Sequence, residues 1–149
     1  MQNLKIVKAD SEYLKEIDEI ENEASLNPWP REITESFLKS EQSAFFLAYF
    51  DNEPAGYISL SYVLDEGSVL NVAVKKKLRN RGIAGALLGE AKKFAENKKL
   101  SFLSLELRES NLPAKKLYER EGFALLGKRY GYYEKPKEDA LIMRCEVKI

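Results

Sequence analysis

The stretch from Asn71 to Ala91, NVAVKKKLRNRGIAGALLGEA, limits the folds open to this chain more than any other segment. It begins with an apolar run, passes through five basic residues in the seven positions 75–81, and continues from Gly82 with small and aliphatic residues at helical spacing. An alternating apolar segment, residues 100–107, follows the expected helix. A strand, a helix and a second strand in this order form a crossover, which makes the two strands parallel.

The other segments predict antiparallel strands and helices around this parallel pair. We therefore expect one α/β domain over residues 1–149, with a mostly antiparallel twisted sheet and a parallel pair around helix 82–97. Residues 51–56 are predicted as a polar turn, and the second helix is expected to turn Ile33, Phe37 and Leu38 inward. The expected strands are 4–8, 44–50, 57–64, 68–74, 100–107, 123–130 and 140–149; the expected helices are 11–24, one from about residue 30, 82–97 and 111–121.

Composition excludes several classes of function. The 149 residues suffice for one domain that buries roughly 68–70% of its unfolded surface. Acidic and basic residues balance at 24 each, which argues against a nucleic-acid or membrane partner. We find no apolar signal segment in the sequence. Its single cysteine, Cys145, is expected in the core, and such sparse use of cysteine is typical of a reducing compartment. A cytoplasmic setting is therefore predicted. The chain has no histidine, which excludes Ser-His-Asp and Cys-His catalysis, and we expect no metal.

The cationic loop before Gly82 is a candidate anion site. A helix N-terminus offers free N–H groups and a partial positive charge, and small residues at 82 and 84–86 let phosphate approach. Arg79 or Arg81 could donate directly to phosphate. The spacing is neither a P-loop nor a complete dinucleotide motif, so a different pyrophosphate-bearing cofactor is expected. The alternative is a solvated turn whose glycine only starts a helix.

Four ordered motifs resemble the GNAT superfamily of N-acetyltransferases, and most closely its RimI type, which acetylates protein N-termini. Arg79, Gly82 and Ala84 match the superfamily's Arg/Gln-x-x-Gly-x-Gly/Ala signature. Residues 63–74 resemble the RimI-type strand that precedes the loop. Residues 105–123 resemble the segment that carries the catalytic groups, and residues 129–143 resemble the C-terminal Tyr-Tyr…Glu-Asp-Ala stretch. NPWP at 27–30 also has a counterpart in the family. Lys75-Lys76 departs from the family's frequent Asp-Pro, which changes the charge of the loop.

The resemblance implies acetyl-coenzyme A as the acetyl donor. Its pyrophosphate would lie on the amides of the loop, its pantetheine arm along the preceding strand, and the oxyanion site near Val74. The positions implied for cofactor binding are Val72, Ala73, Val74, Arg79, Asn80, Arg81, Gly82, Ile83, Ala84, Asn111 and Tyr118.

Glu106 and Tyr118 are the candidate catalytic residues. Strand alternation turns Glu106 away from Leu105 and Leu107, and it matches the family's catalytic glutamate. A carboxylate is a weak base, tolerable for an α-amine of pKa about 7.7–8.0 but poor for a lysine near 10.4, so the chemistry favours an N-terminal amine. Tyr118 matches the family's acid beside the thioester sulfur. The structural alternatives are a solvated strand glutamate and a core tyrosine.

On the acceptor side, Tyr132 and Tyr133 resemble the family's residues that hold a substrate N-terminus. Trp29 could form a wall of the acceptor cleft and Glu66 could select the acceptor's backbone or charge, so both are also candidate substrate-binding residues. Each of the four could instead have a structural role. The implied acceptor is a protein N-terminus, of the kind a small-subunit ribosomal protein with N-terminal alanine presents, and the enzyme is expected as a monomer or weak dimer. Three alternatives are open. They are a GNAT enzyme for a small-molecule amine or lysine, a non-catalytic acetyl-coenzyme A binding module, and a nucleotide-binding regulatory domain.

Overall fold

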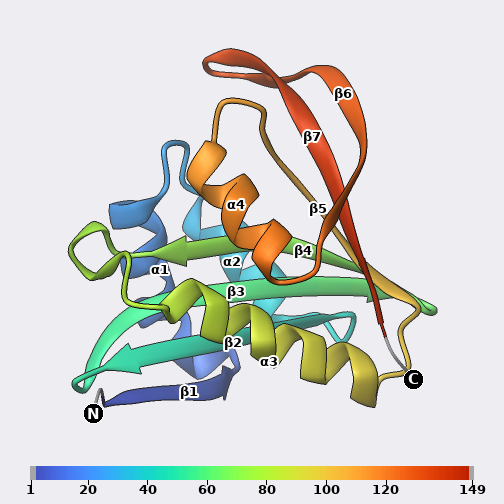
Figure 1. Ribbon diagram of the computed structural model, residues 1–149. Coiled ribbons are helices and arrows are strands. Elements are labelled where there is room, and N and C mark those ends of the chain that lie inside the picture. The colour runs from blue at the N-terminus through green and yellow to red at the C-terminus, as the bar shows by residue number, and fades with distance from the viewer. Residues whose placement is uncertain (1–2, 148–149) are drawn as a thin grey trace.

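The central element is a seven-stranded sheet with the strand order β1-β2-β3-β4-β5-β7-β6, as described by a computed structural model for residues 3–147 (Figure 1). β4 and β5 are parallel, and every other neighbouring pair is antiparallel. This confirms the predicted mixed sheet with its parallel pair. The strands are β1 (Leu4–Ala9), β2 (Ser43–Phe50), β3 (Glu53–Val63), β4 (Glu66–Val74), β5 (Phe102–Arg108), β6 (Ala124–Glu134) and β7 (Lys137–Glu146).

Helices cover both faces of the sheet. α1 (Leu14–Ala24) and α2 (Arg31–Lys39) lie on one face, whereas α3 (Ile83–Asn97) and α4 (Leu112–Arg120) lie on the other (Figure 1). The apolar stripe of α1 packs with Phe45, Leu47 and Tyr57 of the sheet, and that of α3 packs in a larger core on the opposite face. None of the helices in residues 3–147 is both long and apolar enough to cross a membrane.

The sheet opens between its two parallel strands. β4 and β5 pair only from Glu66–Phe102 to Ser68–Ser104. Beyond this point β5 stays paired with β7, while β4 continues to Val74 beside β3 alone. The edge of β4 that faces β5 is therefore left without a strand partner among the described residues, and the two strands form the sides of a cleft.

Two local predictions are wrong. The turn between β2 and β3 is not residues 51–56 but Asp51 and Asn52 alone, both left-handed with φ of 50° and 65°. Such a pair suits a two-residue hairpin, and Pro54 enters the strand beside a register shift at Ala48/Tyr49, where the regular ladder is interrupted.

In α2, Ile33 does not point inward but is 44% exposed. Thr34, which is fully buried, occupies the inward position together with Phe37 and Leu38. These three residues have the spacing of three and four that one helical face requires, and Ile33 lies one position off that face.

The boundaries of the last two strands also differ from the prediction. β6 extends to Glu134, so Tyr132 and Tyr133 belong to a strand and not to a loop. β7 begins earlier than expected, and residues 148–149 of the predicted strand lie outside the described residues. Cys145 is buried, as predicted.

Candidate active site

The cleft between β4 and β5 encloses about 630 Å³ and passes from one face of the sheet to the other. Its walls are residues 68–72 of β4 and 104–108 of β5. Asn111, Ala114 and Tyr118 line it from α4, and Arg129, Tyr132 and Tyr133 line it from β6, together with Trp29. The cleft lining thus contains both predicted catalytic residues and five other predicted site residues, which are Trp29, Val72, Asn111, Tyr132 and Tyr133.

Glu106 projects into this cleft from the middle of β5. Leu105 and Leu107 on either side of it are buried in the core under α3, so Glu106 faces the opposite side, as alternation predicts. Its side chain is 29% exposed, and its Oε2 lies 2.5 Å from Nε of Arg129. The N–H of Arg129 is not directed at this oxygen, so the contact is an ion pair without a hydrogen bond. Glu106 is therefore a lining group of the cleft and not a solvated surface residue.

Tyr118 approaches the same cleft from α4. Its ring packs against Phe123, with 5.8 Å between the centroids, while the side chain also lines the cleft. Tyr118 therefore packs in the core, as one interpretation of the sequence predicts, and also lines the cleft, as the other predicts. Burial, with a smaller effect of nearby Tyr133, raises the pKa of Tyr118 to about 12. The phenol therefore keeps its proton at any physiological pH and can act as a hydrogen-bond donor.

The loop before α3 has the geometry of an anion cradle. Gly82 is the N-cap of α3 with φ of +81°, and Asn80 is also left-handed with φ of +64°. The amides of residues 83–85 have no acceptor one turn earlier in the helix, as at any helix start. Left-handed residues in such a loop turn amide N–H groups toward one concave surface, a usual way to hold phosphate. A Cβ at Gly82 would meet no protein atom within 4 Å, so the space beside this residue is open.

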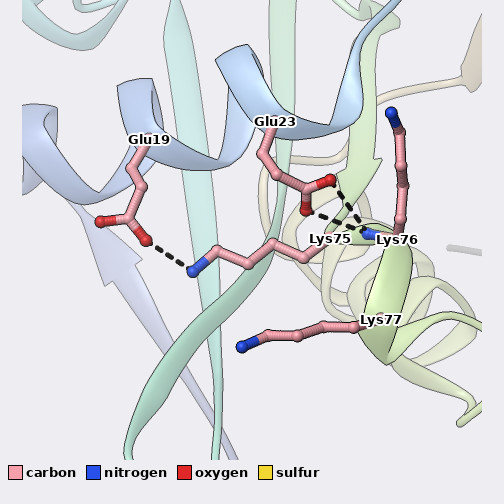
Figure 2. Close-up of a pocket in the computed structure, with 5 residues that line it drawn as sticks. All are labelled: Glu19, Glu23, Lys75, Lys76 and Lys77. Atoms are coloured by element: carbon pink, nitrogen blue, oxygen red, sulfur yellow. Dashed lines mark hydrogen bonds and ion pairs between the residues drawn. The ribbon is translucent and has the colours of Figure 1, made fainter.

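The lysines of the same loop are not available to an anion in the way the sequence suggested. Lys75 is buried, and its Nζ lies 2.5 Å from Oε2 of Glu19 and 3.6 Å from that of Glu53. Lys77 pairs with Glu53 at 2.8 Å. Figure 2 shows Lys75 reaching toward Glu19 and the Lys76 amide donating to Glu23, both carboxylates being on α1. The loop is pinned to α1, so it is not a plain solvated turn, and the charges of Lys75 and Lys77 are balanced by carboxylates within the protein.

The two arginines of the loop differ in their contacts. Arg79 donates from Nε to the Val74 carbonyl and from Nη2 to the Ala24 carbonyl, each at 3.1 Å. Its guanidinium thus ties the loop to the end of α1, which leaves it poorly placed to donate directly to phosphate. Arg81 is exposed and lies over the Phe50 ring at 5.4 Å. An anion at this loop would therefore meet chiefly the backbone amides and Arg81.

Four further predicted cofactor positions have clear structural roles. Asn111 is the N-cap of α4, where its Oδ1 accepts from the Ala114 amide at 3.2 Å, and it also lines the cleft. Ala73 and Val74 bury their side chains in the two cores, so only their backbone atoms remain for a ligand beside β4. The same holds for Ile83, whose side chain is 2% exposed.

Aromatic side chains line part of the cleft. Tyr132 and Tyr133 meet edge to face with centroids 5.0 Å apart, and Arg108 lies 4.4 Å above the Tyr133 ring. Partial burial, and then the charge of Glu106, raise the pKa of Tyr132. Trp29 stacks on Phe37 at 5.1 Å and still reaches the cleft, so it is both an anchor of α2 and a wall.

Of the four predicted substrate-binding residues, Glu66 is the one that the structure does not place in the cleft lining. It begins β4 at the closed end of the strand pair, opposite Phe102 and Val63.

Sequence reasoning missed three residues of this region. Arg129 pairs with Glu106 from β6, and Asn71 lines the cleft from β4. Glu21 is 1% exposed beneath the cleft wall. The sequence does indicate that Glu21 is buried, because this residue lies four positions after Ile17 and seven after Leu14, inside the apolar stripe of α1. Arg129 and Asn71 give no such signal, since only the tertiary structure brings Arg129 to Glu106 and Asn71 to Tyr57.

The site thus combines a sheet split between β4 and β5, an open loop at the start of α3 and a carboxylate inside the cleft. Residues 14–123 match the acetyltransferase (GNAT) family. The chain is 31% identical over 144 residues to the putative ribosomal protein bS18-alanine N-acetyltransferase of Bacillus subtilis, covering 96% of this chain and 92% of the relative. The chain therefore belongs to the GNAT family of acetyltransferases.

Two further comparisons describe the range of this similarity. The crystal structure of the ribosomal-protein-S18-alanine N-acetyltransferase from Escherichia coli superposes with a TM-score of 0.91 at 29% identity, over 98% of this chain and 95% of that one. A streptothricin acetyltransferase from Escherichia coli is 32% identical over 69% of this chain and 60% of its own length. Members of this family take the acetyl group from acetyl-coenzyme A.

Proposed function

We propose that this acetyltransferase modifies the α-amine of a protein N-terminus, that of a small-subunit ribosomal protein beginning with alanine. The observation behind this proposal is the single carboxylate, Glu106, on the acceptor side of the cleft, in a chain that has no histidine. A carboxylate base suits an amine of pKa about 7.7–8.0 far better than a lysine near 10.4. The names of the relatives from Bacillus subtilis and Escherichia coli support the same acceptor. A ribosomal acceptor would place the enzyme in the cytoplasm.

Residues on the two sides of the cleft have different roles in the reaction. Bound acetyl-coenzyme A supplies an activated acetyl thioester. The amides at the start of α3 hold its pyrophosphate, and the free edge of β4 near Val74 offers backbone N–H groups to the pantetheine arm and to the developing oxyanion. Glu106 takes the proton of the amine, directly or through one water. Tyr118 donates a hydrogen bond to the departing sulfur.

Replacement of Tyr118 by phenylalanine is expected to lower kcat about tenfold, the worth of one hydrogen bond to a charged group. The effect is limited because a phenol with a pKa of about 12 stabilises a thiolate of ordinary pKa near 8.5 without fully protonating it. A raised pKa means that the proton stays on to higher pH. The wild-type enzyme should therefore show no loss of kcat centred on pH 10, where an ordinary tyrosine ionises. A fall in kcat centred on pH 10 that disappears in Tyr118→Phe would contradict the raised pKa, and a wild-type kcat in Tyr118→Phe would contradict the role as hydrogen-bond donor.

The proposed function is tested by coenzyme A release with two short peptides. One has a free N-terminal alanine and no lysine, and the other has a blocked N-terminus and one internal lysine. We expect turnover on the first alone. Turnover on the lysine peptide, or on a small amine such as streptothricin but on neither peptide, would replace the proposal with the corresponding acceptor. Binding of acetyl-coenzyme A without turnover on any amine would indicate a non-catalytic module.

A further inference from the structure

A buried carboxylate lies directly behind the acceptor side of the cleft. Glu21 of α1 is 1% exposed and has three partners. The Tyr57 hydroxyl donates to its Oε1 at 2.7 Å, Ser25 Oγ donates to the same oxygen at 2.9 Å, and the Trp29 amide donates to Oε2 at 2.9 Å. All three partners are donors, so Glu21 acts as an acceptor only.

This arrangement fixes the direction of the next hydrogen bond. Burial, and then the Glu21 carboxylate, raise the pKa of Tyr57, which is itself fully buried, so the hydroxyl keeps its proton. That one proton is directed to Glu21, and the Tyr57 oxygen can then only accept. Its second partner is Asn71, whose Nδ2 donates to it at 3.0 Å. Glu21 therefore determines, through Tyr57, that the amino half of the Asn71 amide faces the protein.

The carbonyl half of the same amide is left free. Asn71 lines the cleft from β4. Within residues 3–147, no hydrogen bond reaches its Oδ1, and the atom is not buried. Trp29, whose amide is held by the same carboxylate, lines the cleft as well. One buried group thus fixes two parts of the cleft wall, and one of them presents an oriented hydrogen-bond acceptor.

We propose that Asn71 is a specificity-determining residue of the acceptor site, whose Oδ1 accepts a hydrogen bond from the acceptor's amino nitrogen. The inference rests on the proposed function. A primary amine that gives one proton to Glu106 still has two N–H groups, and each needs an acceptor when water is excluded. Tyr57 and Glu21 are positioning residues, because they act on the amine only through the orientation of Asn71.

The test is steady-state kinetics of Asn71→Leu with the alanine peptide, together with calorimetric binding of acetyl-coenzyme A. Leucine keeps the approximate shape and removes both halves of the amide. We expect the KM for the peptide to rise about tenfold, the effect of one lost hydrogen bond between polar partners. The Kd for acetyl-coenzyme A should stay within about twofold of wild type, a limit that corresponds to well under 1 kcal/mol.

Two variants accompany this measurement. Tyr57→Phe retains Asn71 but frees its amide to turn, so we expect a smaller rise in peptide KM and the same Kd for acetyl-coenzyme A. Asn22→Leu makes the same substitution at an exposed position of α1, where the side chain contacts only the Asp18 carbonyl, and serves as the control.

Two outcomes would overturn the inference, and they are distinguishable. If Asn71→Leu acetylates the peptide with wild-type KM, Asn71 does not recognise the amine although the proposed function holds. If the wild-type enzyme leaves the peptide unmodified, the proposed function fails and this inference with it. A change confined to kcat in Asn71→Leu also counts against a role in acceptor recognition.

Discussion

Replacement of Glu106 by glutamine is expected to lower kcat on a peptide with free N-terminal alanine about 10²–10⁴-fold, the usual contribution of a positioned general base. Glutamine has the same shape but cannot take a proton. The Kd for acetyl-coenzyme A should stay at its wild-type value, because Glu106 faces away from the α3 side of the sheet where the amide cradle lies. Stopped-time coenzyme A release and calorimetry measure the two quantities separately.

The size of this effect follows from the composition of the cleft. The chain has no histidine, and the other titratable side chains of the cleft lining are Arg108, Tyr118, Arg129, Tyr132 and Tyr133. Arginine has no lone pair to accept a proton. The pKa of each of the three tyrosines is raised, that of Tyr118 and of Tyr133 to about 12, so none of them is present as phenolate near neutral pH. Among the described lining residues, Glu106 is the one group that can act as a base.

Glu109→Gln is the matched control. Glu109 lies three residues later, pairs with Lys128 at 2.5 Å and does not line the cleft. It should retain full activity, and a similar loss in both variants would point to disturbance of the strand. A fast Glu106→Gln enzyme would show that the amine arrives already deprotonated and that no protein base is needed.

Much of the fold is predictable because its signals are local. The crossover from β4 through α3 to β5 follows from one apolar run, one helical stripe and one alternating segment. The face of Glu106 follows from the same alternation, since its neighbours Leu105 and Leu107 must be buried. A departure such as Ile33 is an error of one position within a correctly predicted helix.

The remaining features depend on contacts between segments that are distant in the sequence. The cleft exists because β5 leaves β4 after Ser104 and stays with β7, and no pattern within either strand encodes that choice. Lys75 has a partner 56 positions earlier, so a basic run in the sequence becomes a neutralised ion-pair group in the protein. Arg129 reaches Glu106 only because β6 folds back over the site. Charge counted along a loop does not give the charge that a ligand meets.

The second substitution with a large expected effect is in the loop before α3, at Gly82. Gly82→Ala is expected to raise the Kd for acetyl-coenzyme A about tenfold to hundredfold, the range for losing hydrogen bonds to a charged group. Lys75 and Lys77 are paired with carboxylates and Arg79 is held by backbone carbonyls, so these three side chains cannot compensate for a misplaced amide. A φ of +81° costs alanine about 1–2 kcal/mol, so the loop relaxes away from the geometry that directs its amides outward.

Calorimetric titration and thermal melting separate the two consequences of this substitution. The added Cβ would meet no protein atom within 4 Å, so stability should fall only by the backbone strain, while affinity falls by the loss of the cradle as well. Gly89→Ala in the middle of α3 is the control, because its Cβ also has free space and alanine there stabilises a helix by about 1 kcal/mol. Wild-type affinity in Gly82→Ala would mean that the pyrophosphate is held by side chains such as Arg81, and the amide cradle would then have to be abandoned as the anion site.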